Sequence, residues 1–217
     1  MTSRAGVHAP NPEGLDVFYP ILPDSAWIAR LVPLGLRTVQ LRLKDASPDD
    51  VRRQIAESLA ICKAEGCQLI VNDYWREALA LGADYIHLGQ EDLATADVSE
   101  IKRAGTRLGI STHTPEELDI ALAAGADYVA LGPIWETRLK AMKWAPQGLD
   151  RIGEWRRRIG AVPLVAIGGI TPERAGSVID VGADSAAVIT DFMTAADPAG
   201  RIATWLGWAA AARARRA

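Results

Sequence analysis

Short apolar runs recur along the chain, and each is separated from the next by an amphipathic stretch and a glycine. The runs have the length of buried strands and lie at residues 17–22, 38–41, 68–71, 85–88, 107–110, 128–131, 163–167 and 186–189. Between them, stretches such as 49–64 carry apolar residues at helical spacing. A glycine just after a helix closes its last turn in the left-handed conformation. The pattern therefore predicts eight strands alternating with helices.

Near-continuous apolar strands that alternate with helices are typical of a parallel sheet with helices on the outside. Eight strands in a chain of 217 residues favour a single closed (β/α)8 TIM barrel. An open doubly wound sheet stays an alternative, because the pattern does not prove closure. Residues 1–15, with Pro10, Pro12 and Gly14, are expected to be a flexible N-terminal tail, and residues 16–217 the barrel domain.

Composition narrows the class of protein. A hydrophobic content of 49% and a charged content of 24% are ordinary for a soluble globular protein. A net charge of -3, without a basic block in the body of the chain, argues against nucleic-acid binding. No apolar run reaches the length of a membrane span, so we expect no membrane partner. Only Cys62 and Cys67 are present, which suits a reducing cytoplasm and implies no disulfide framework.

Two aspartates follow neighbouring apolar runs directly, Asp73 after the third and Asp92 after the fourth. A carboxylate gains nothing from burial beside an apolar strand, so stability alone would not place two there. Carboxylates at neighbouring strand ends can hold Mg²⁺ and leave room for substrate phosphates. The alternative is that one or both aspartates cap the helix that follows.

The second strand carries polar residues at every other position. Gln40, Arg42 and Lys44 alternate with apolar residues, so they are expected to share the face that points toward the barrel axis. Two cations that point inward need an anionic partner to offset their desolvation. That partner is either Asp73 or Asp92, in an internal ion pair, or a bound anion.

Other strand ends carry features of a phosphate site. Gly168 and Gly169 precede a helix start, where backbone N–H groups can approach an oxyanion. The last strand ends at Thr190, and barrels of this class often bind phosphate after their seventh and eighth strands. The long loop at 132–148 is typical of a functional segment. Within it, Lys140 either reaches a substrate anion or is a solvated surface lysine.

Three further polar residues carry weaker signals. Ser111 and His113 lie two residues apart, but no acidic residue is placed to complete a nucleophilic triad. His87 lies inside a strand pattern, where a histidine is more often a satisfied core residue than a catalyst. These residues alone do not define a reaction.

Six ordered segments at strand ends together resemble the thiamine-phosphate synthase (thiamine-phosphate pyrophosphorylase) family. The resemblance covers about residues 17–192, nearly all of the expected barrel. No single segment is specific for this family, but the six segments in this order are. The matching segments are residues 39–44, 72–73, 87–92, 109–113, 132–133 with Lys140, and 165–170.

The resemblance implies an enzyme that joins a hydroxymethylpyrimidine pyrophosphate to a thiazole phosphate, or its carboxylated form, and releases pyrophosphate. With Mg²⁺ as cofactor, Asp73 and Asp92 look like the metal ligands. The residues that look like pyrophosphate contacts are Gln40, Arg42, Lys44, Asn72 and Lys140, with Ser111 near the leaving group. Those that look like the pyrimidine pocket are His87, Gly89 and Gln90. Those that look like the thiazole-phosphate cradle are Thr137, Gly168, Gly169, Ile189 and Thr190.

The implied chemistry needs no strong general base. The aminopyrimidine can stabilise positive charge on its methylene as the C–O bond breaks, and the attacking thiazole nitrogen carries no proton. The site must then stabilise departing pyrophosphate and position the nucleophile. The partners implied are the two small-molecule substrates, and a homodimer is left open.

The chain departs from the family pattern at several positions. They are Tyr74 in place of the usual arginine, Trp135-Glu136 in place of an aromatic-proline pair, Leu139 in place of threonine, and Thr190-Asp191 in place of serine and a small residue. These changes bear on the phosphate contacts near Thr137 and Thr190. They leave the aspartate pair unchanged.

Two alternative functions remain. One is a thiazole tautomerase, an aromatising isomerase of similar fold, which the segment 135–137 and His113 favour slightly. That relative lacks the Asn-Asp and Gly-Gln-Glu-Asp segments, because it handles no pyrophosphate. The other is a non-catalytic sensor of a phosphate ligand, which would need neither both aspartates nor the cations of the second strand.

Overall fold

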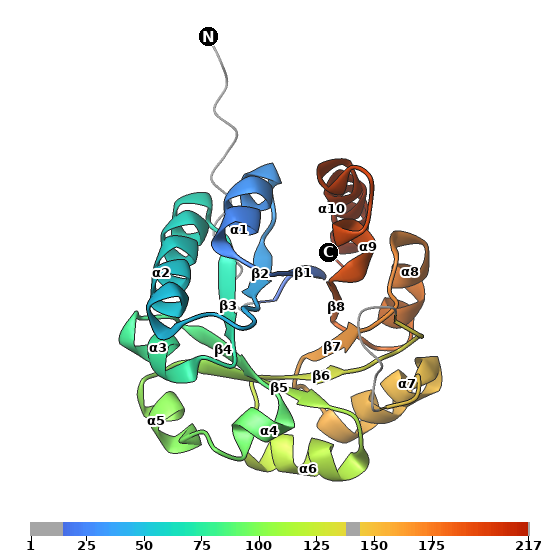
Figure 1. Ribbon diagram of the computed structural model, residues 1–217. Coiled ribbons are helices and arrows are strands. Elements are labelled where there is room, and N and C mark those ends of the chain that lie inside the picture. Colours follow the sequence, from blue (N-terminus) through green and yellow to red (C-terminus); the bar gives the residue numbers. More distant parts are fainter. Residues whose placement is uncertain (1–14, 138–143, 217) are drawn as a thin grey trace.

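Eight parallel strands close into a barrel in the order in which they occur along the chain. The computed structural model describes residues 15–137 and 144–216. Figure 1 shows the strands at the centre and the helices outside them. Every neighbouring pair is parallel, and β1 pairs with β8 through Phe18 and Ala186, which closes the sheet. The prediction of a closed TIM barrel is confirmed, and the open sheet is excluded.

The elements follow the predicted alternation closely. The strands are β1 (Phe18–Leu22), β2 (Thr38–Leu41), β3 (Gln68–Asn72), β4 (Tyr85–Leu88), β5 (Arg107–Thr112), β6 (Tyr128–Leu131), β7 (Leu164–Ile167) and β8 (Ser185–Val188). The α-helices are α1 (Ser25–Leu31), α2 (Pro48–Glu65), α3 (Trp75–Ala80), α4 (Gln90–Leu93), α5 (Val98–Arg103), α6 (Pro115–Ala123), α7 (Gly148–Ile159), α8 (Pro172–Asp180), α9 (Thr190–Met193) and α10 (Pro198–Ala214), and a short 3-10 helix spans Val32–Leu34. Across the described residues, no helix combines the length and the apolarity needed to cross a bilayer.

The hydrophobic core has two parts, one on each face of the sheet. The larger part lies between strands and helices, where for example Phe18 stacks on Trp205 of α10 at 4.7 Å between ring centroids. The smaller part fills the barrel. Its largest members are Tyr19, Tyr85 and Tyr128, and Tyr128 meets the other two rings edge-on. Because successive strand residues face opposite sides, Phe18 and Tyr19 serve different parts of the core.

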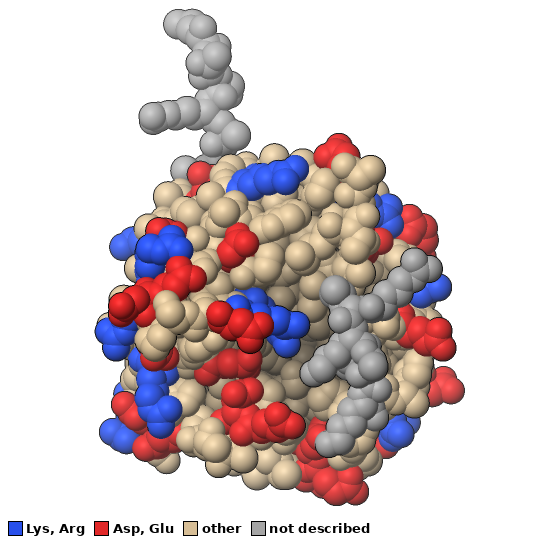
Figure 2. All heavy atoms as spheres, viewed as in Figure 1, with Lys and Arg blue, Asp and Glu red and all other residues tan. Residues whose placement is uncertain are grey.

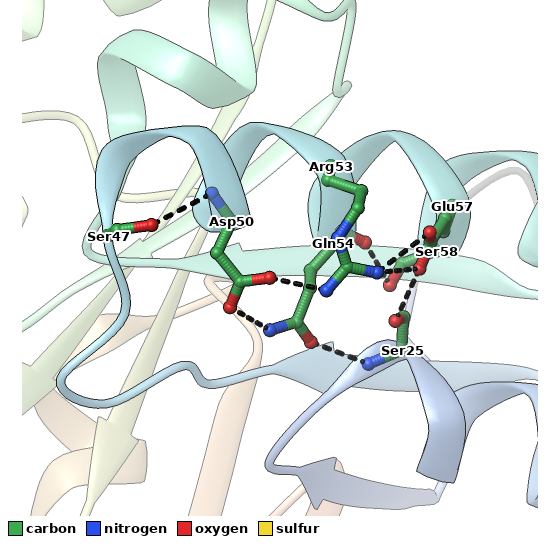
Figure 3. A network of polar contacts seen from close by, with 7 residues as sticks. All are labelled: Ser25, Ser47, Asp50, Arg53, Gln54, Glu57 and Ser58. Atoms are coloured by element: carbon green, nitrogen blue, oxygen red, sulfur yellow. Dashed lines mark hydrogen bonds and ion pairs between the residues drawn. The ribbon is translucent and has the colours of Figure 1, made fainter.

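Polar contacts on the outside of the barrel join α1 to α2 (Figure 3). Gln54 accepts a hydrogen bond from the backbone N–H of Ser25 at 3.0 Å, and Glu57 accepts one from the Ser25 hydroxyl at 2.7 Å. Arg53 pairs with both Asp50 and Glu57 one helical turn away on either side. Such exposed i,i+3 and i,i+4 pairs contribute little each. The contacts of Ser25 with α2 are the polar link between the two helices, beside the apolar core that they share.

The repeated Gly-Ala-Asp turns stabilise the amino-terminal rim of the barrel. Asp127 accepts a hydrogen bond from the backbone N–H of Leu108 at 2.6 Å and pairs with Lys102. Asp184 repeats the arrangement with the N–H of Leu164 at 2.8 Å and with Arg156. In both cases one carboxylate satisfies a strand N–H at the start of a neighbouring strand and also binds a helix cation. This rim therefore serves stability, as expected for the end opposite the active site.

Gly109, in β5, makes room for an aromatic ring inside the barrel. A Cβ atom at this position would lie 2.1 Å from two ring atoms of Tyr128, so the ring would have to move. A glycine in a strand often marks such a close approach.

We expect Gly109→Ala to lower the free energy of unfolding by about 1–3 kcal/mol, because the Tyr128 ring must move in a packed interior. The control is Gly176→Ala in α8, where an added Cβ meets nothing within 4 Å. It should raise stability by about 0.5–1 kcal/mol through helix propensity. Urea denaturation of both variants checks this, and equal stability of the two would contradict the packing argument.

Candidate active site

Asp73 and Asp92 lie together at the carboxyl-terminal rim. Asp73 follows β3 in a left-handed conformation, with φ of 64°, and its N–H donates to the carbonyl of His87 on β4 at 2.9 Å. Asp92 lies in the first turn of α4, just after β4. Both line one hollow of about 180 Å³ between α3 and α4. A non-glycine residue in this conformation costs about 1–3 kcal/mol and is held by its surroundings.

Neither aspartate caps a helix, so that interpretation was wrong. The N-cap residue of α3 is Tyr74 and that of α4 is Gly89, and neither helix start has a side-chain cap. The carboxylates are thus left to face each other and the hollow.

The proximity of the two carboxylates changes the chemistry of Asp73. Burial raises its pKa to about 6, the Asp92 carboxylate adds to the rise, and the charge of Arg42 and the Asn72 amide oppose it. A shared divalent cation would favour the ionised form instead, since opposite charge lowers a carboxyl pKa. Among the described residues, no group of three or more His, Cys, Asp or Glu side chains could enclose a metal. A cation on this pair would complete its coordination with water or phosphate oxygens, which suits Mg²⁺.

The cations of the second strand do not pair with these aspartates. β2 ends at Leu41, although the N–H of Arg42 still donates to the carbonyl of Leu22 at 2.9 Å. Arg42 is half-buried, whereas Lys44 is exposed. Across the described residues, no ion pair joins either cation to Asp73 or Asp92. An internal ion pair of Arg42 or Lys44 with Asp73 or Asp92 is therefore excluded. Figure 2 shows acidic and basic side chains beside one another at the hollow on this face.

A chain of hydrogen bonds crosses the barrel interior just below the rim. Nε2 of Gln40 donates to the Tyr19 hydroxyl, and the hydroxyls of Tyr19 and Tyr128 lie 2.9 Å apart. The Tyr128 hydroxyl lies 2.7 Å from Nδ1 of His87, and Nε2 of that ring lies 2.8 Å from Oγ of Ser111. The chain joins side chains from β2, β1, β6, β4 and β5. It links three positions expected to contact substrate: Gln40, His87 and Ser111.

Burial keeps the members of this chain uncharged. Burial lowers the pKa of His87 to about 3, and the nearby charge of Arg42 lowers it further. Burial likewise raises the pKa of the Tyr19 and Tyr128 hydroxyls well above their usual range. His87 is thus a neutral hydrogen-bonding residue at neutral pH, neither an apolar core residue nor a charged catalyst.

The two tyrosines were missed by reasoning from sequence. The period of two in their strands indicated that both face the barrel axis, and a hydroxyl inside a barrel needs a partner. The strand register that brings them to His87 was not predictable from the local pattern. Gln90 supports the same region, since its amide donates to the carbonyl of Ser111 at 2.6 Å.

His113 is not a partner of Ser111. Its Nδ1 lies 2.8 Å from Glu117, and its ring stacks on Trp144 with centroids 5.3 Å apart. The spacing of two along the chain placed Ser111 and His113 together, but the hydrogen-bonded histidine is His87 on the neighbouring strand.

The paired glycines after β7 lie against the loop after β6. Gly168 and Gly169 have φ of 100° and 67°. A Cβ on Gly168 would lie 2.7 Å from Pro133, and one on Gly169 would lie 2.7 Å from Cβ of Trp135. Any other residue at either position would clash with the loop after β6. Thr137 lies half-buried at the end of the described part of that loop, and Lys140 lies outside the described residues.

The chain has Asp191 after β8, where the family pattern has a small residue, but this aspartate adds little net charge to the rim because it is paired. Asp191 binds Arg201 through two contacts of 2.8 Å and accepts a hydrogen bond from the Trp205 indole at 2.8 Å. Its carboxylate is thereby neutralised by α10. Ile189, between β8 and α9, and Thr190, the first residue of α9, are half-buried. Their expected role in phosphate binding is compatible with an aspartate that follows them.

The fold and the site define a TIM-barrel enzyme that has a carboxylate pair at one rim and, among the described residues, cations there without an ion-pair partner. The sequence profile described as "Thiamine monophosphate synthase" matches residues 21–192, well over half of the chain. The chain belongs to this family.

Individual relatives agree with the family match. The thiamine-phosphate synthase of Rhizobium etli is 58% identical over 192 residues, which cover 88% of this chain and 94% of that protein. The thiamine-phosphate synthase of Neisseria meningitidis serogroup A is 45% identical over 181 residues, covering 83% and 88%. The solved thiamine phosphate pyrophosphorylase of Pyrococcus furiosus superposes with a TM-score of 0.80 at 25% identity, covering 92% of this chain and 98% of that one.

We expect Asp92→Asn to raise the free energy of unfolding of the metal-free protein at pH 7.5, by on the order of 1 kcal/mol after solvent screening. The raised pKa of Asp73 means that the folded protein holds its proton more tightly than the unfolded chain does. Its contribution to stability therefore falls as pH rises through the interval from about 4 to about 6. Removing the charge of Asp92 lessens this loss.

Urea denaturation in the presence of a chelator measures the effect. The matched control is Asp16→Asn, since Asp16 is buried and accepts two contacts, of 2.9 and 2.7 Å, from Arg213. It should lose stability because the cation is left without its partner. Equal losses in the two variants would show that Asp92 stabilises the fold as an ordinary structural carboxylate.

Proposed function

We propose that this protein condenses 4-amino-2-methyl-5-hydroxymethylpyrimidine pyrophosphate with 4-methyl-5-(2-phosphoethyl)thiazole, or its carboxylated form, to give thiamine phosphate and pyrophosphate. The observation that carries the proposal is the aspartate pair with Arg42 near enough to act on Asp73, none of the three having an ion-pair partner among the described residues. This arrangement suits a doubly phosphorylated anion bound through a divalent cation.

The metal site would be formed by Asp73 and Asp92. Their oxygens are the ligands that Mg²⁺ prefers, and the adjoining hollow leaves room for water. Bound there, the ion would neutralise charge on the departing pyrophosphate. Arg42 and Lys44 would supply further charge-assisted hydrogen bonds to the same group, each worth about 1.5–3 kcal/mol. Asn72, buried beside Asp73, and Lys140 are proposed as additional contacts.

The substrates would occupy two sides of the barrel mouth. His87, Gly89 and Gln90 would hold the pyrimidine above the hydrogen-bond chain, with Ser111 near the breaking C–O bond and Gln40 as a further pyrophosphate contact. The thiazole phosphate would lie on the opposite side. Its cradle would be formed by Thr137, Gly168, Gly169, Ile189 and Thr190. The strict steric need for the two glycines supports this placement, because a turn held so closely presents its backbone rather than side chains to the mouth.

The reaction needs positioning and charge stabilisation more than proton transfer. We infer a dissociative displacement, in which the aminopyrimidine carries positive charge as pyrophosphate leaves. The neutral state of His87 supports this route, because a protonated ring beside the pyrimidine would oppose a developing cation. The two buried free thiols, Cys62 and Cys67, agree with a reducing compartment such as the cytoplasm.

The isomerase alternative gains little from the site. His113, which favoured it, is paired with Glu117 and stacked on Trp144. Aromatisation of the thiazole handles no pyrophosphate, so it would leave the aspartate pair and the unpaired cations without a task. A sensor would leave them equally unused.

We expect the purified protein to form thiamine phosphate only when both substrates and Mg²⁺ are present. Asp73→Ala and Asp92→Ala should each lower kcat at least about 100-fold, because charge on the leaving group loses its stabilisation. Quantifying thiamine phosphate with and without a chelator makes the measurement. Asp119→Ala is the matched control, since Asp119 is an exposed aspartate of α6 paired with Arg158.

Full activity after chelation, or in the Asp73→Ala, Asp92→Ala double variant, would overturn the metal assignment. Absence of product from authentic substrates, together with aromatisation of the thiazole precursor, would replace the synthase with the isomerase.

A further inference from the structure

We infer that Tyr19 and Tyr128 are positioning residues that fix the direction of proton donation along the interior hydrogen-bond chain, so that the Ser111 hydroxyl presents its proton to the barrel mouth. The inference rests on the proposed function, in which Ser111 lies near the departing pyrophosphate. Neither tyrosine needs to contact a substrate, because each acts through the next member of the chain.

The direction of hydrogen-bond donation is set first at Gln40. Its amide nitrogen can only donate, so the Tyr19 oxygen accepts from it. Tyr19 is 1% exposed, and its other hydroxyl partner is Tyr128 at 2.9 Å. A buried O–H that is not donated costs about 1–3 kcal/mol. The proton of Tyr19 therefore goes to the oxygen of Tyr128.

The same direction of hydrogen-bond donation continues through His87 to Ser111. Having accepted from Tyr19, the Tyr128 hydroxyl gives its one proton to Nδ1 of His87 at 2.7 Å. The neutral ring then carries its own proton on Nε2, which lies 2.8 Å from the Ser111 oxygen. Ser111 accepts that hydrogen bond, which leaves its hydroxyl proton for an acceptor at the mouth.

The packing holds this chain in one geometry. The His87 and Tyr128 rings stack, with centroids 5.4 Å apart and an interplanar angle of 19°. Tyr128 is fully buried, and Gly109 is what gives its ring space. Gln90 fixes the backbone of Ser111 through its carbonyl. The Ser111 residue is therefore held by groups on four other strands and on α4 rather than by its own rotamer preference.

The consequence is chemical. Charge develops on the pyrophosphate oxygen as its bond to carbon breaks, and a donor already aimed at that position needs no reorganisation. With the opposite direction along the chain, Ser111 would donate to His87 and offer only a lone pair. Two tyrosines that would otherwise be core residues thus decide whether Ser111 assists the leaving group.

The first test reads the His87 tautomer in the substrate-free protein by ¹⁵N NMR of histidine side chains. The chain has three histidines, and His87→Gln identifies the signal. We expect the proton on Nε2 in the wild-type protein and a mixture of tautomers in Tyr128→Phe, which lacks the donor to Nδ1. A wild-type ring protonated on Nδ1, or an unchanged tautomer in Tyr128→Phe, would overturn the inference. This reading needs no turnover, so it is independent of the proposed function.

The second test compares kinetics. Tyr128→Phe and Tyr19→Phe should lower kcat about three- to tenfold, the worth of one hydrogen bond, with KM changed less than twofold. Tyr85→Phe is the matched control, because Tyr85 packs edge-on against Tyr128 but is not a member of the chain. Equal kcat values in the three variants would contradict the inference. Should Tyr128→Phe not fold, Tyr19→Phe breaks the chain one bond earlier and is measured in both tests.

Discussion

The mutual repulsion of Asp73 and Asp92 is the constraint around which the rim of this barrel is arranged. The fold holds one of them in a left-handed conformation and brings the other beside it, and burial with like charge raises the pKa of Asp73 to about 6. Nothing in the described structure neutralises the pair, although Arg42 lies near enough to oppose the shift. Like charges that are held together at a cost in stability are typical of a functional site. The neutralising positive charge is then supplied by a ligand.

Stability and function are separated along the barrel axis. At the amino-terminal rim each repeated aspartate is satisfied, since Asp127 and Asp184 both bind a strand N–H and a helix cation. At the opposite rim Asp73, Asp92 and Arg42 have no ion-pair partner among the described residues. Between them, the interior tyrosines contribute to both tasks: their rings fill the barrel and their hydroxyls order His87 and Ser111. This division explains why residues of similar type have opposite roles at the two ends.

The repeating pattern of the chain was sufficient to predict the barrel, because eight apolar runs with a fixed direction leave few topologies. The same pattern placed Gln40 inside, where it is 2% exposed. Lys44 lies three residues beyond the end of β2 at Leu41 and is exposed, so its inward direction stays a prediction. The link from Ser111 to His87 depends on how β5 and β4 lie against each other, which local periodicity does not specify. The sequence showed only that Ser111 and His113 lie two residues apart, which defined no pair. The roles of the individual site residues stay predictions.

Titration of the metal-free protein with Mg²⁺, in the presence and absence of pyrophosphate, tests most directly whether the aspartate pair and the cations form one site. Two carboxylates alone hold Mg²⁺ weakly, and phosphate oxygens complete its coordination. We expect calorimetry to show Mg²⁺ binding at least about tenfold tighter with pyrophosphate, and by reciprocity pyrophosphate binding equally strengthened by Mg²⁺. Mg²⁺ affinity that does not change when pyrophosphate is added would contradict this reading of Asp73 and Asp92.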